Sequence, residues 1–446
     1  MSFDPGARGI AAQARAAAAA LSLRNLGNVG IRIFGGRVAN AKALASGAAA
    51  GRTFEVVATT ALPFDAIRVV MAFGQTSGAN AITPSAYVSV KPVAEIGDAA
   101  IATDSGWTAV TFGGANGIGG SATPSFAPAA DQNRRVYTVS DVIPVASVAR
   151  SDGGRYPAVV IRAYLYTSGT AGNYVIQGNG SQNFDAWETH LSGRIWRMRG
   201  KGGNFANTTQ SGMTRALSVA ENGAPIVGIV YYARGKVVNV AGFGDSITEG
   251  QGTYVGEGFG FPACQALSDN ATGIAYEWSN LGWSGQTTGQ IRQQVLDAVA
   301  TPGLKFDIGV LPGGSPNDIT ATIGEADIAA TRFKVSHMLD LMRGGGMATV
   351  LWTWLPTNTA VRNYGASDSQ RRALNDDYRT WGSRGAVIAD FDKALAGATS
   401  GGQVQLLTDS ADDNIHPSDG GNARLSPLLA RAVQGLSAIA PGMLAA

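Results

Sequence analysis

The chain of 446 residues has 34 basic and 32 acidic side chains, so it lacks the excess positive charge that nucleic-acid binding requires. Its one cysteine, Cys264, excludes an intrachain disulfide and a CxxC zinc site, and no apolar run reaches the length of about 18 residues of a membrane span. With 60 glycines and only 15% charged residues, the composition favours a turn-rich protein that contains β-structure.

An Ala-rich segment lies near the start of the chain. Residues 5–24 are predicted to form a helix, and a Gly/Ala-rich connection follows to about residue 51, so residues 1–50 are set apart as a first segment. No basic stretch precedes the alanines, which favours an exposed or self-associating helix over a signal peptide. The sequence therefore leaves open whether the protein forms a homo-oligomer. It also leaves open where the protein is located: in the cytoplasm, outside the cell after export by another route, or in a virion.

Residues 51–235 alternate apolar and polar side chains with a period of two. Within residues 66–73, Ile67, Val69 and Met71 share one face and Arg68 lies on the other, and residues 158–166 follow the same pattern. Gly-rich breaks such as GGANGIGGS separate these runs. Short alternating strands with glycine turns predict an antiparallel β-sandwich.

Residues 236–446 have a different pattern, in which short apolar runs alternate with helical periodicity. The apolar runs cover residues 237–242, 277–281, 306–311, 347–355 and 386–391. The helical patterns cover residues 288–300, 325–343, 367–381 and 421–436. Strands buried on both faces that alternate with helices predict a parallel α/β sheet. No long linker separates it from the sandwich.

Two polar segments of this second domain carry candidate catalytic groups. Ser246 lies where the strand VVNVAG turns into FGDSITEG, with Gly244 to allow a tight turn and Asp245 to cap a helix. His416 lies in DDNIHPSDGG, three residues after Asp413, and a carboxylate there can orient an imidazole. Taken alone, each segment also fits a capped turn. No G-x-S-x-G motif is present, so the α/β-hydrolase elbow is not the scheme.

The other two histidines are interpreted as structural or surface residues, because His337 lies inside a helical pattern and His190 in the β region. No zinc motif or phosphate-binding loop occurs in its required context, so neither a metal nor a cofactor is predicted. The sequence therefore predicts a site that binds a substrate without a cofactor.

Four segments together resemble the GDSL, or SGNH, hydrolase superfamily. They are G-D-S-I-T-E-G at 244–250, N-L-G-W-S-G-Q-T-T at 280–288, G-G-S-P-N-D at 313–318 and D-D-N-I-H-P at 412–417. They occur in the family's order, and the resemblance covers residues 236–446. It implies a three-layer α/β/α domain that hydrolyses carboxylic esters with a nucleophilic serine.

The resemblance assigns roles to individual residues. Ser246 would be the nucleophile, His416 its base, and Asp413 the carboxylate that orients the histidine. The oxyanion hole would use the Ser246 and Gly285 backbone amides, with Gly282 as the alternative glycine, and the Asn317 side chain. The third segment departs from the family's usual G-x-N-D, because Ser315 occupies the glycine position and Pro316 follows it. This departure leaves the placement of Asn317 open.

The substrate is less well defined by the sequence. Trp283, Tyr254 and Trp354 are candidate substrate-binding aromatics, and core packing is an equal alternative for Trp354. A β-domain directly before an SGNH domain is similar to two-domain carbohydrate esterases, which carry a jelly-roll module there. Three functions follow: an esterase that removes acyl groups, foremost acetyl, from a carbohydrate; an esterase or lipase for small or lipid esters; and a structural, surface or virion protein that carries a hydrolase domain. The expected partner is thus an acylated small molecule or polysaccharide.

Overall fold

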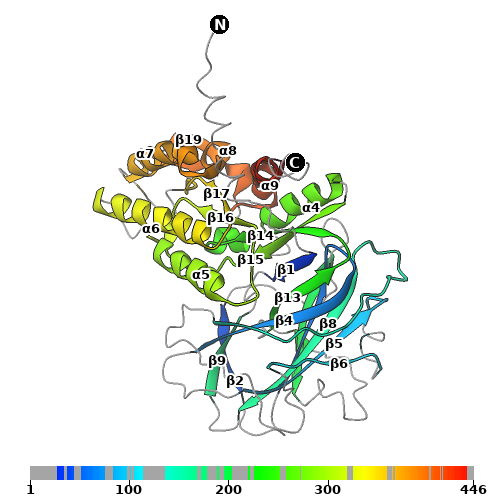
Figure 1. Cartoon of the computed structure of the whole chain (residues 1–446). Helices are drawn as coiled ribbons and strands as arrows, with labels where there is room; N and C mark the ends of the chain where they lie inside the picture. Colours follow the sequence, from blue (N-terminus) through cyan, green and yellow to red (C-terminus); the bar gives the residue numbers. More distant parts are fainter. Residues whose placement is uncertain are drawn as a thin grey trace.

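The computed structural model describes residues 28–34, 38–44, 52–75, 84–97, 101, 105–113, 136–167, 172–177, 188–189, 195–202, 219–220, 226–251, 258–271, 273–318, 325–358, 364, 367–400, 403–411, 413 and 415–438. They form a β-sandwich, at the bottom of Figure 1, beneath an α/β domain. Among the helices described, none is both long and apolar enough to cross a bilayer.

The first sheet of the sandwich is antiparallel, in the order β1-β13-β4-β9-β2, with β7 paired to β4. The strands are β1 (Val29–Ile33), β2 (Val38–Leu44), β4 (Phe64–Gln75), β7 (Val136–Val139), β9 (Gly172–Gln177) and β13 (Ile226–Ala233). Alternation along β4 sends Ile67, Val69 and Met71 into the sandwich core. Val70 and Ala72 face the other way, into the core shared with the α/β domain.

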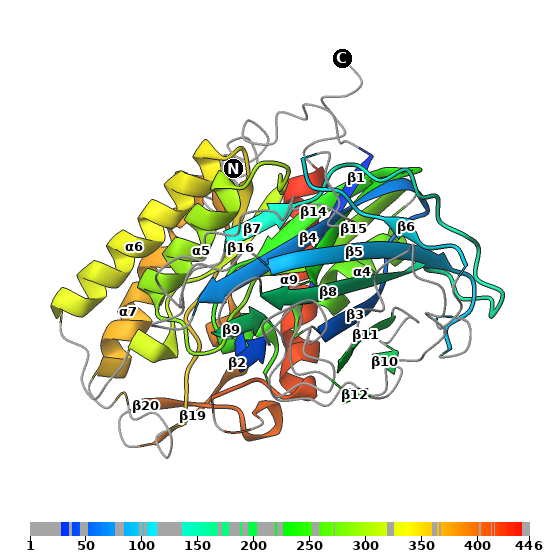
Figure 2. The same cartoon turned by 90° about the horizontal axis from the view of Figure 1, so that it is seen from below.

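The second sheet is also antiparallel, in the order β10-β11-β3-β8-β5-β6, with β12 paired to β11. The strands are β3 (Arg52–Thr59), β5 (Pro84–Val93), β6 (Thr108–Ala109), β8 (Ala158–Thr167), β10 (Glu188–Thr189), β11 (Ile195–Gly202) and β12 (Val219–Ala220). Phe54 and Val56 of β3 lie opposite Ala163 and Ile161 of β8, and all four are buried in the sandwich core. The prediction of an antiparallel sandwich is confirmed; Figure 2 shows both sheets from below.

Residues 1–50 differ from the sequence prediction in the part that the structure describes. Strands β1 and β2 lie in the stretch for which the sequence predicted only a Gly/Ala-rich connection. Their partners are β13 and β9, which lie far away along the chain, so a local pattern carries little information about this pairing. The helix predicted over residues 5–24 lies outside the described residues.

The α/β domain contains a five-stranded parallel sheet in the order β15-β14-β16-β17-β18. The strands are β14 (Lys236–Gly242), β15 (Ile274–Asn280), β16 (Ile308–Pro312), β17 (Ala348–Trp352) and β18 (Ala386–Ala389). Because the chain proceeds from β14 to β15 on one side and later to β16 on the other, the topological switch point of the sheet, where such folds usually bind ligands, lies at the carboxyl ends of β14 and β16.

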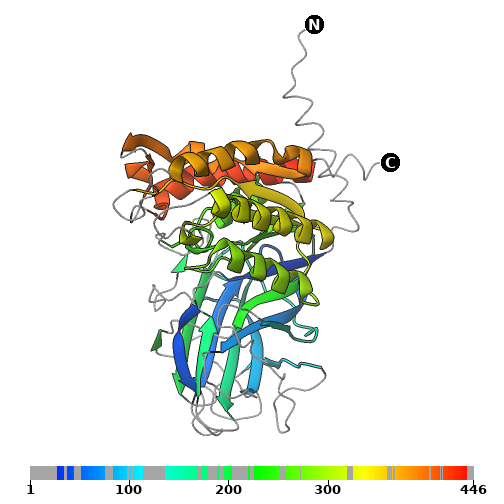
Figure 3. The same cartoon turned by 90° about the vertical axis from the view of Figure 1, so that its left-hand side faces the viewer.

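Helices cover both faces of this sheet, which confirms the predicted α/β/α architecture. The helices are α3 (Ser246–Glu249), α4 (Gly260–Asn270), α5 (Thr288–Ala300), α6 (Glu325–Gly344), α7 (Ser367–Arg379), α8 (Phe391–Leu395) and α9 (Asp419–Ala438). One face packs against α4, α8 and α9. The other packs against α5, α6 and α7, the green-yellow to orange helices of Figure 3.

Shorter elements complete the domain. They are the hairpin of β19 (Ala396–Ser400) and β20 (Gln403–Leu406) and the 3₁₀ turns η2 (Pro316–Asp318), η3 (Trp381–Arg384) and η4 (Thr408–Ser410). Neither the hairpin nor α4 was predicted. The first turn of α4 contains Gly260 and Pro262, two residues that weaken a helical pattern.

The sandwich itself covers part of the second sheet face, beside α5. Two polar side chains of the parallel sheet bind the backbone of edge strand β1. Asn239 accepts from Ile31 N at 2.6 Å and donates to Val29 O at 2.9 Å, and Ser279 Oγ contacts Ile33 N and Ile31 O. The two domains therefore pack directly, through a buried interface in which the polar groups are paired.

Candidate active site

Ser246 lies at the amino end of α3, at the carboxyl end of β14. Asp245 caps this short helix, since its Oδ1 accepts from Ile247 N at 2.9 Å. Gly244 is required before it, because a Cβ there would lie 2.0 Å from Thr248 Oγ1. The Gln294 side chain of α5 holds the Gly244 backbone on both sides, accepting from its N–H and donating to its carbonyl. The turn that carries Ser246 is thus fixed by both backbone and side-chain contacts.

His416 lies in the loop before α9, and this loop is closed on itself. Ser418 N donates to Ser410 O at 2.9 Å, and Ala411 forms a bridge with Pro417. Asp413 Oδ1 accepts from the backbone N–H groups of Ile415 and His416, as in an Asx turn. The backbone of the loop therefore fixes the Asp413 carboxylate independently of its contact with the imidazole.

The structure brings Ser246, His416 and Asp413 into one hydrogen-bonded chain. His416 Nε2 lies 2.7 Å from Ser246 Oγ, and Nδ1 lies 2.7 Å from Asp413 Oδ2. Ser246 is 5% exposed and His416 7% exposed. Partial burial acts to raise the pKa of Asp413, but hydrogen bonds from His416 and Ile415 outweigh it and hold that pKa below its ordinary value. This arrangement can transfer the serine proton to the histidine.

Two backbone amides near Ser246 have no hydrogen-bond partner among the described residues: those of Ser246 itself and Gly285. Gly285 has φ +82°, and a Cβ built on it meets no atom within 4 Å, so it borders open space. The alternative glycine, Gly282, differs in both respects. Its N–H donates to Asn280 Oδ1, and its Cα packs so closely that a Cβ would lie 2.4 Å from Glu249 N. Gly285 thus has the N–H available to a ligand.

Asn317 lies in η2, after β16, and its side-chain amide is engaged within the protein. Its Nδ2 donates to Gln286 O at 3.1 Å and to Ser315 Oγ at 3.2 Å. Both amide hydrogens therefore have an acceptor in this structure. To act as an oxyanion donor, Asn317 has to exchange one of these contacts for the oxyanion.

The two aspartates beside the predicted site residues have local structural contacts. Asp245 is fully buried, caps α3 and contacts Ser315 Oγ, and burial raises the pKa of its carboxyl. Asp318 accepts from the backbone N–H and the hydroxyl of Thr288, at the start of α5. Both carboxyl groups join catalytic loops to neighbouring elements.

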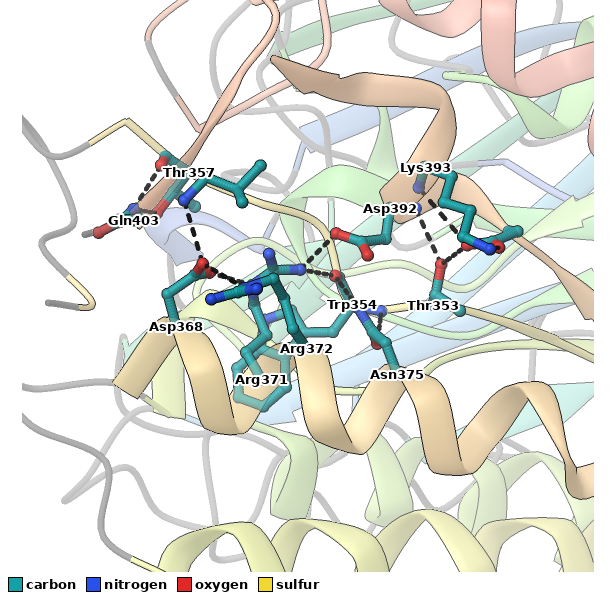
Figure 4. A network of polar contacts seen from close by, with 12 residues as sticks. Thr353, Trp354, Thr357, Asp368, Arg371, Arg372, Asn375, Asp392, Lys393 and Gln403 are labelled. Atoms are coloured by element: carbon teal, nitrogen blue, oxygen red, sulfur yellow. Dashed lines mark hydrogen bonds and ion pairs between the residues drawn. The ribbon is translucent and has the colours of Figure 1, made fainter. Parts of the chain in front are cut away.

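Trp354 packs under the active-site loops as a core residue. It is 1% exposed, packs edge-on against Tyr364, and lies so close to Gly314 that a Cβ there would be 2.3 Å from its ring. Asn375 pairs with both the N–H and the carbonyl of Trp354, and Arg371 Nη1 donates to the same carbonyl, as Figure 4 shows. Of the two interpretations of Trp354, core packing is the one seen in this structure.

The remaining predicted residues are placed as follows. Trp283 is 5% exposed. Its backbone N–H donates to Gly244 O, so it joins the second segment to the nucleophile turn. Tyr254 and His190 lie outside the described residues. His337 lies on α6, where its ring centroid is 6.3 Å from that of Phe333, and the histidine that contacts Ser246 is His416.

Sequence reasoning missed three residues that hold the site together: Gln294, Glu249 and Ser315. Glu249 Oε2 accepts from Ser284 N at 2.7 Å and so joins α3 to the loop of Gly285. An amide or carboxyl group on a helix carries no local signal for such a contact. Ser315 did have a signal, because it departs from the G-x-N-D pattern.

A model of the GDSL-like lipase/acylhydrolase family matches residues 243–424, a range that contains the Ser246 turn, both middle loops and the His416 loop. These residues are therefore a GDSL-like lipase/acylhydrolase domain, and the protein is a carboxylic ester hydrolase of this class. No curated protein sequence matches the chain.

Several solved structures resemble part of the chain. A GDSL-like lipase from Bacteroides thetaiotaomicron has 18% identity and a TM-score of 0.35, over 44% of this chain and 87% of that one. A lipase/acylhydrolase from Enterococcus faecalis has 18% identity and a TM-score of 0.34, over 44% and 96%. A family 3 carbohydrate esterase from Clostridium thermocellum has 17% identity and a TM-score of 0.33, over 46% and 100%. The family assignment rests on the sequence match and not on these structures.

Proposed function

We propose that the protein is a serine esterase in which Ser246 attacks the ester carbonyl, His416 acts as general base and then general acid, and Asp413 orients His416. The observation that carries the proposal is the continuous chain from Asp413 Oδ2 through the imidazole to Ser246 Oγ, with 2.7 Å at each link. A serine hydroxyl is too weak a nucleophile unless a base removes its proton.

The steps follow from these contacts. As Ser246 Oγ bonds to the carbonyl carbon, its proton passes to His416 Nε2, and the carbonyl oxygen becomes negative. When the intermediate collapses, the histidine gives that proton to the departing alcohol, which leaves an acyl-serine. Water, deprotonated by His416, then attacks the acyl carbon, and His416 returns that proton to Ser246 Oγ as the acid leaves. Asp413 stays ionised and stabilises the imidazolium in both halves of the reaction.

The negative oxygen needs donors that are in place before it forms. The free N–H groups of Ser246 and Gly285 supply two, and Asn317 supplies a third by exchanging one of its present partners. Removal of one such donor typically costs about 2.7–4 kcal/mol in the barrier.

The substrate proposal is an acyl ester, foremost acetyl, on a carbohydrate. It is supported by the sequence arrangement of a sandwich before the hydrolase domain. The alternative is an esterase for small or lipid esters in which the sandwich has a structural role; its support is the core that the two domains share. The third alternative, a structural or surface role, is compatible with either chemistry.

The test is chemical labelling combined with a substrate series. A fluorophosphonate should label the wild-type protein at Ser246, and Ser246→Ala should abolish labelling and lower kcat for an aryl acetate by at least about a thousandfold. An acetate-over-octanoate preference, and a higher kcat/KM for an acetylated glycan than for the aryl acetate, would support the carbohydrate proposal. Retention of most activity in folded Ser246→Ala would contradict the serine mechanism.

A further inference from the structure

The hydroxyl of Ser315 lies where three catalytic loops meet. Ser315 follows β16 and is fully buried. Its Oγ lies 2.5 Å from Asp245 Oδ2, on the turn that carries the nucleophile, and 2.8 Å from Gln286 O, on the loop that carries Gly285. One side chain thus touches both of the loops that contribute the backbone oxyanion donors.

The same hydroxyl also contacts Asn317. It lies 3.2 Å from Asn317 N and 3.2 Å from Asn317 Nδ2. A hydroxyl has one hydrogen to donate and two lone pairs to accept with. It can therefore donate to Asp245 or to Gln286 and accept both N–H groups of Asn317, which uses its full hydrogen-bonding capacity.

These contacts determine the orientation of the Asn317 amide. Its two hydrogens point to two acceptors, Ser315 Oγ and Gln286 O, and two acceptors fix the plane of an amide. Without the hydroxyl, Gln286 O alone would remain as a hydrogen-bond acceptor for Nδ2 among the described residues, and the amide could rotate about that bond. Pro316, between Ser315 and Asn317, has a restricted φ and keeps the two side chains at a short spacing.

We propose that Ser315 is a positioning residue for Asn317. When Asn317 Nδ2 exchanges Gln286 O for the oxyanion, its contact with Ser315 Oγ remains, ties the amide to the Ser246 turn through Asp245, and so sets how well that amide stabilises the oxyanion. In this chain a buried hydroxyl stands where the family's third segment usually has glycine, and it takes part in holding the asparagine. The inference rests on the proposed role of Asn317 in ester hydrolysis.

The first test is Ser315→Ala in the full chain. Because a mispositioned donor acts on the transition state, kcat for an aryl acetate should fall by about 10- to 100-fold, somewhat less than the usual loss of a whole donor, while KM changes by less than about twofold. Ser426→Ala is the matched control, since Ser426 is also buried and its Oγ also lies within hydrogen-bond distance of two acceptors, here the backbone carbonyls of Phe259 and Asn422. Its kcat should equal that of the wild type.

The decisive measurement is a double-mutant cycle with Asn317→Ala. If Ser315 acts through Asn317, the double variant should have the kcat of Asn317→Ala to within about twofold. If the two losses multiply, Ser315 acts on its own or through the general fold, and the proposal is overturned. All rates are expressed per fluorophosphonate-reactive site, so that a reduced folded fraction does not enter the comparison.

A second variant covers the case in which alanine prevents folding. Ser315→Gly has the residue usual in the family's third segment and removes only the hydroxymethyl group. The proposal expects a loss of kcat similar to that of Ser315→Ala; full activity in Ser315→Gly would overturn it. The proposed function fails on a different result, an active Ser246→Ala, so the two failures are distinguishable.

Discussion

At the scale of single residues, the Asp413 carboxylate is held by three hydrogen bonds, two from backbone N–H groups and one from the His416 ring. These donors favour the ionised form, and the pKa of Asp413 is lowered. The carboxylate should therefore remain charged throughout the neutral range and be available to orient His416 at every pH there.

Asp413→Asn tests this expectation. An asparagine keeps the size of the side chain but offers the imidazole the wrong partner, so kcat should fall by about 10³–10⁴-fold. The loss should be present at every pH from about 5 to about 8, because Asp413 itself does not titrate in that window. The measurement is the pH–rate profile of both proteins on one aryl ester. A loss confined to one end of the window would show that another group controls the rate.

The pKa of a second carboxyl group, that of Asp245, is shifted in the opposite direction. Burial raises the pKa of Asp245, so the folded state binds this proton more tightly than the unfolded chain does. The corresponding stability is fully present below the unfolded pKa of about 3.9 and is lost as the pH rises through the folded pKa. Asp245→Asn cannot titrate and lacks this dependence.

The free energy of unfolding of wild type minus that of Asp245→Asn should therefore decrease from about pH 3.5 to neutral pH. Urea unfolding at several pH values measures this difference. A difference that does not change with pH would mean that Asp245 titrates alike in the folded and unfolded states.

At the scale of elements, α7 is joined to the strand end after β17 by a buried ion network (Figure 4). Arg371 has a fully buried side chain and binds Asp368, Asp392 and the Trp354 carbonyl. The next residue, Arg372, binds the other oxygen of Asp368, yet its side chain is 48% exposed. The helix thus offers two arginines that share one partner and differ in burial.

Arg371→Ala should lower the free energy of unfolding by about 3–5 kcal/mol, because it leaves buried carboxylates without their main partner. Arg372→Ala should cost less than about 1 kcal/mol, since the Arg372 side chain is half-exposed and its charge is screened by water, while Arg371 still pairs with Asp368. Urea denaturation of the two variants gives the comparison. Equal losses would show that the buried pair contributes no more than the surface pair.

The elements of the α/β domain were the part of the fold most readily predicted from the sequence. Its strands are buried on both faces, so their apolar runs were continuous and the helices between them periodic. β1 and β2 were not predicted, because their partners lie far along the chain. At the site, each segment alone was ambiguous, and the resemblance of four ordered segments to the GDSL family brought Ser246, Asp413 and His416 together. The contacts of Gln294 and Ser315 depend on side chains that meet only after folding, so only the altered third segment pointed to one of them.

At the scale of the whole molecule, the two domains share buried residues. Ile31, Val70 and Val230 of the sandwich pack in one cluster with Phe243 and Leu281 of the α/β domain. Glu277 of β15 is fully buried and accepts from Tyr231 Oη at 2.6 Å and from Ala61 N at 3.0 Å. Deleting the sandwich would expose these groups, so we expect deletion of residues 1–233 to lower stability together with every activity.

The chain should therefore unfold in one cooperative transition, with calorimetric and van't Hoff enthalpies nearly equal. Asn239→Ala should keep the single transition but lower the free energy of unfolding by about 1–3 kcal/mol, because two backbone groups of β1 lose their partner. The control is Asn270→Ala at the exposed end of α4, where the side chain donates to Ala266 O of its own helix. Two separate calorimetric peaks would contradict the shared core.

The side chains of Asn239 and Ser279 take the place that a neighbouring strand would occupy beside β1. An open strand edge invites pairing with other molecules, and here it is closed by the protein's own catalytic half. The peptide connection between the halves is then not what keeps them together. If the chain were cut between Ala233 and Gly235, the two fragments should stay bound and co-elute, and the ester-cleaving half should retain its activity as a non-covalent complex.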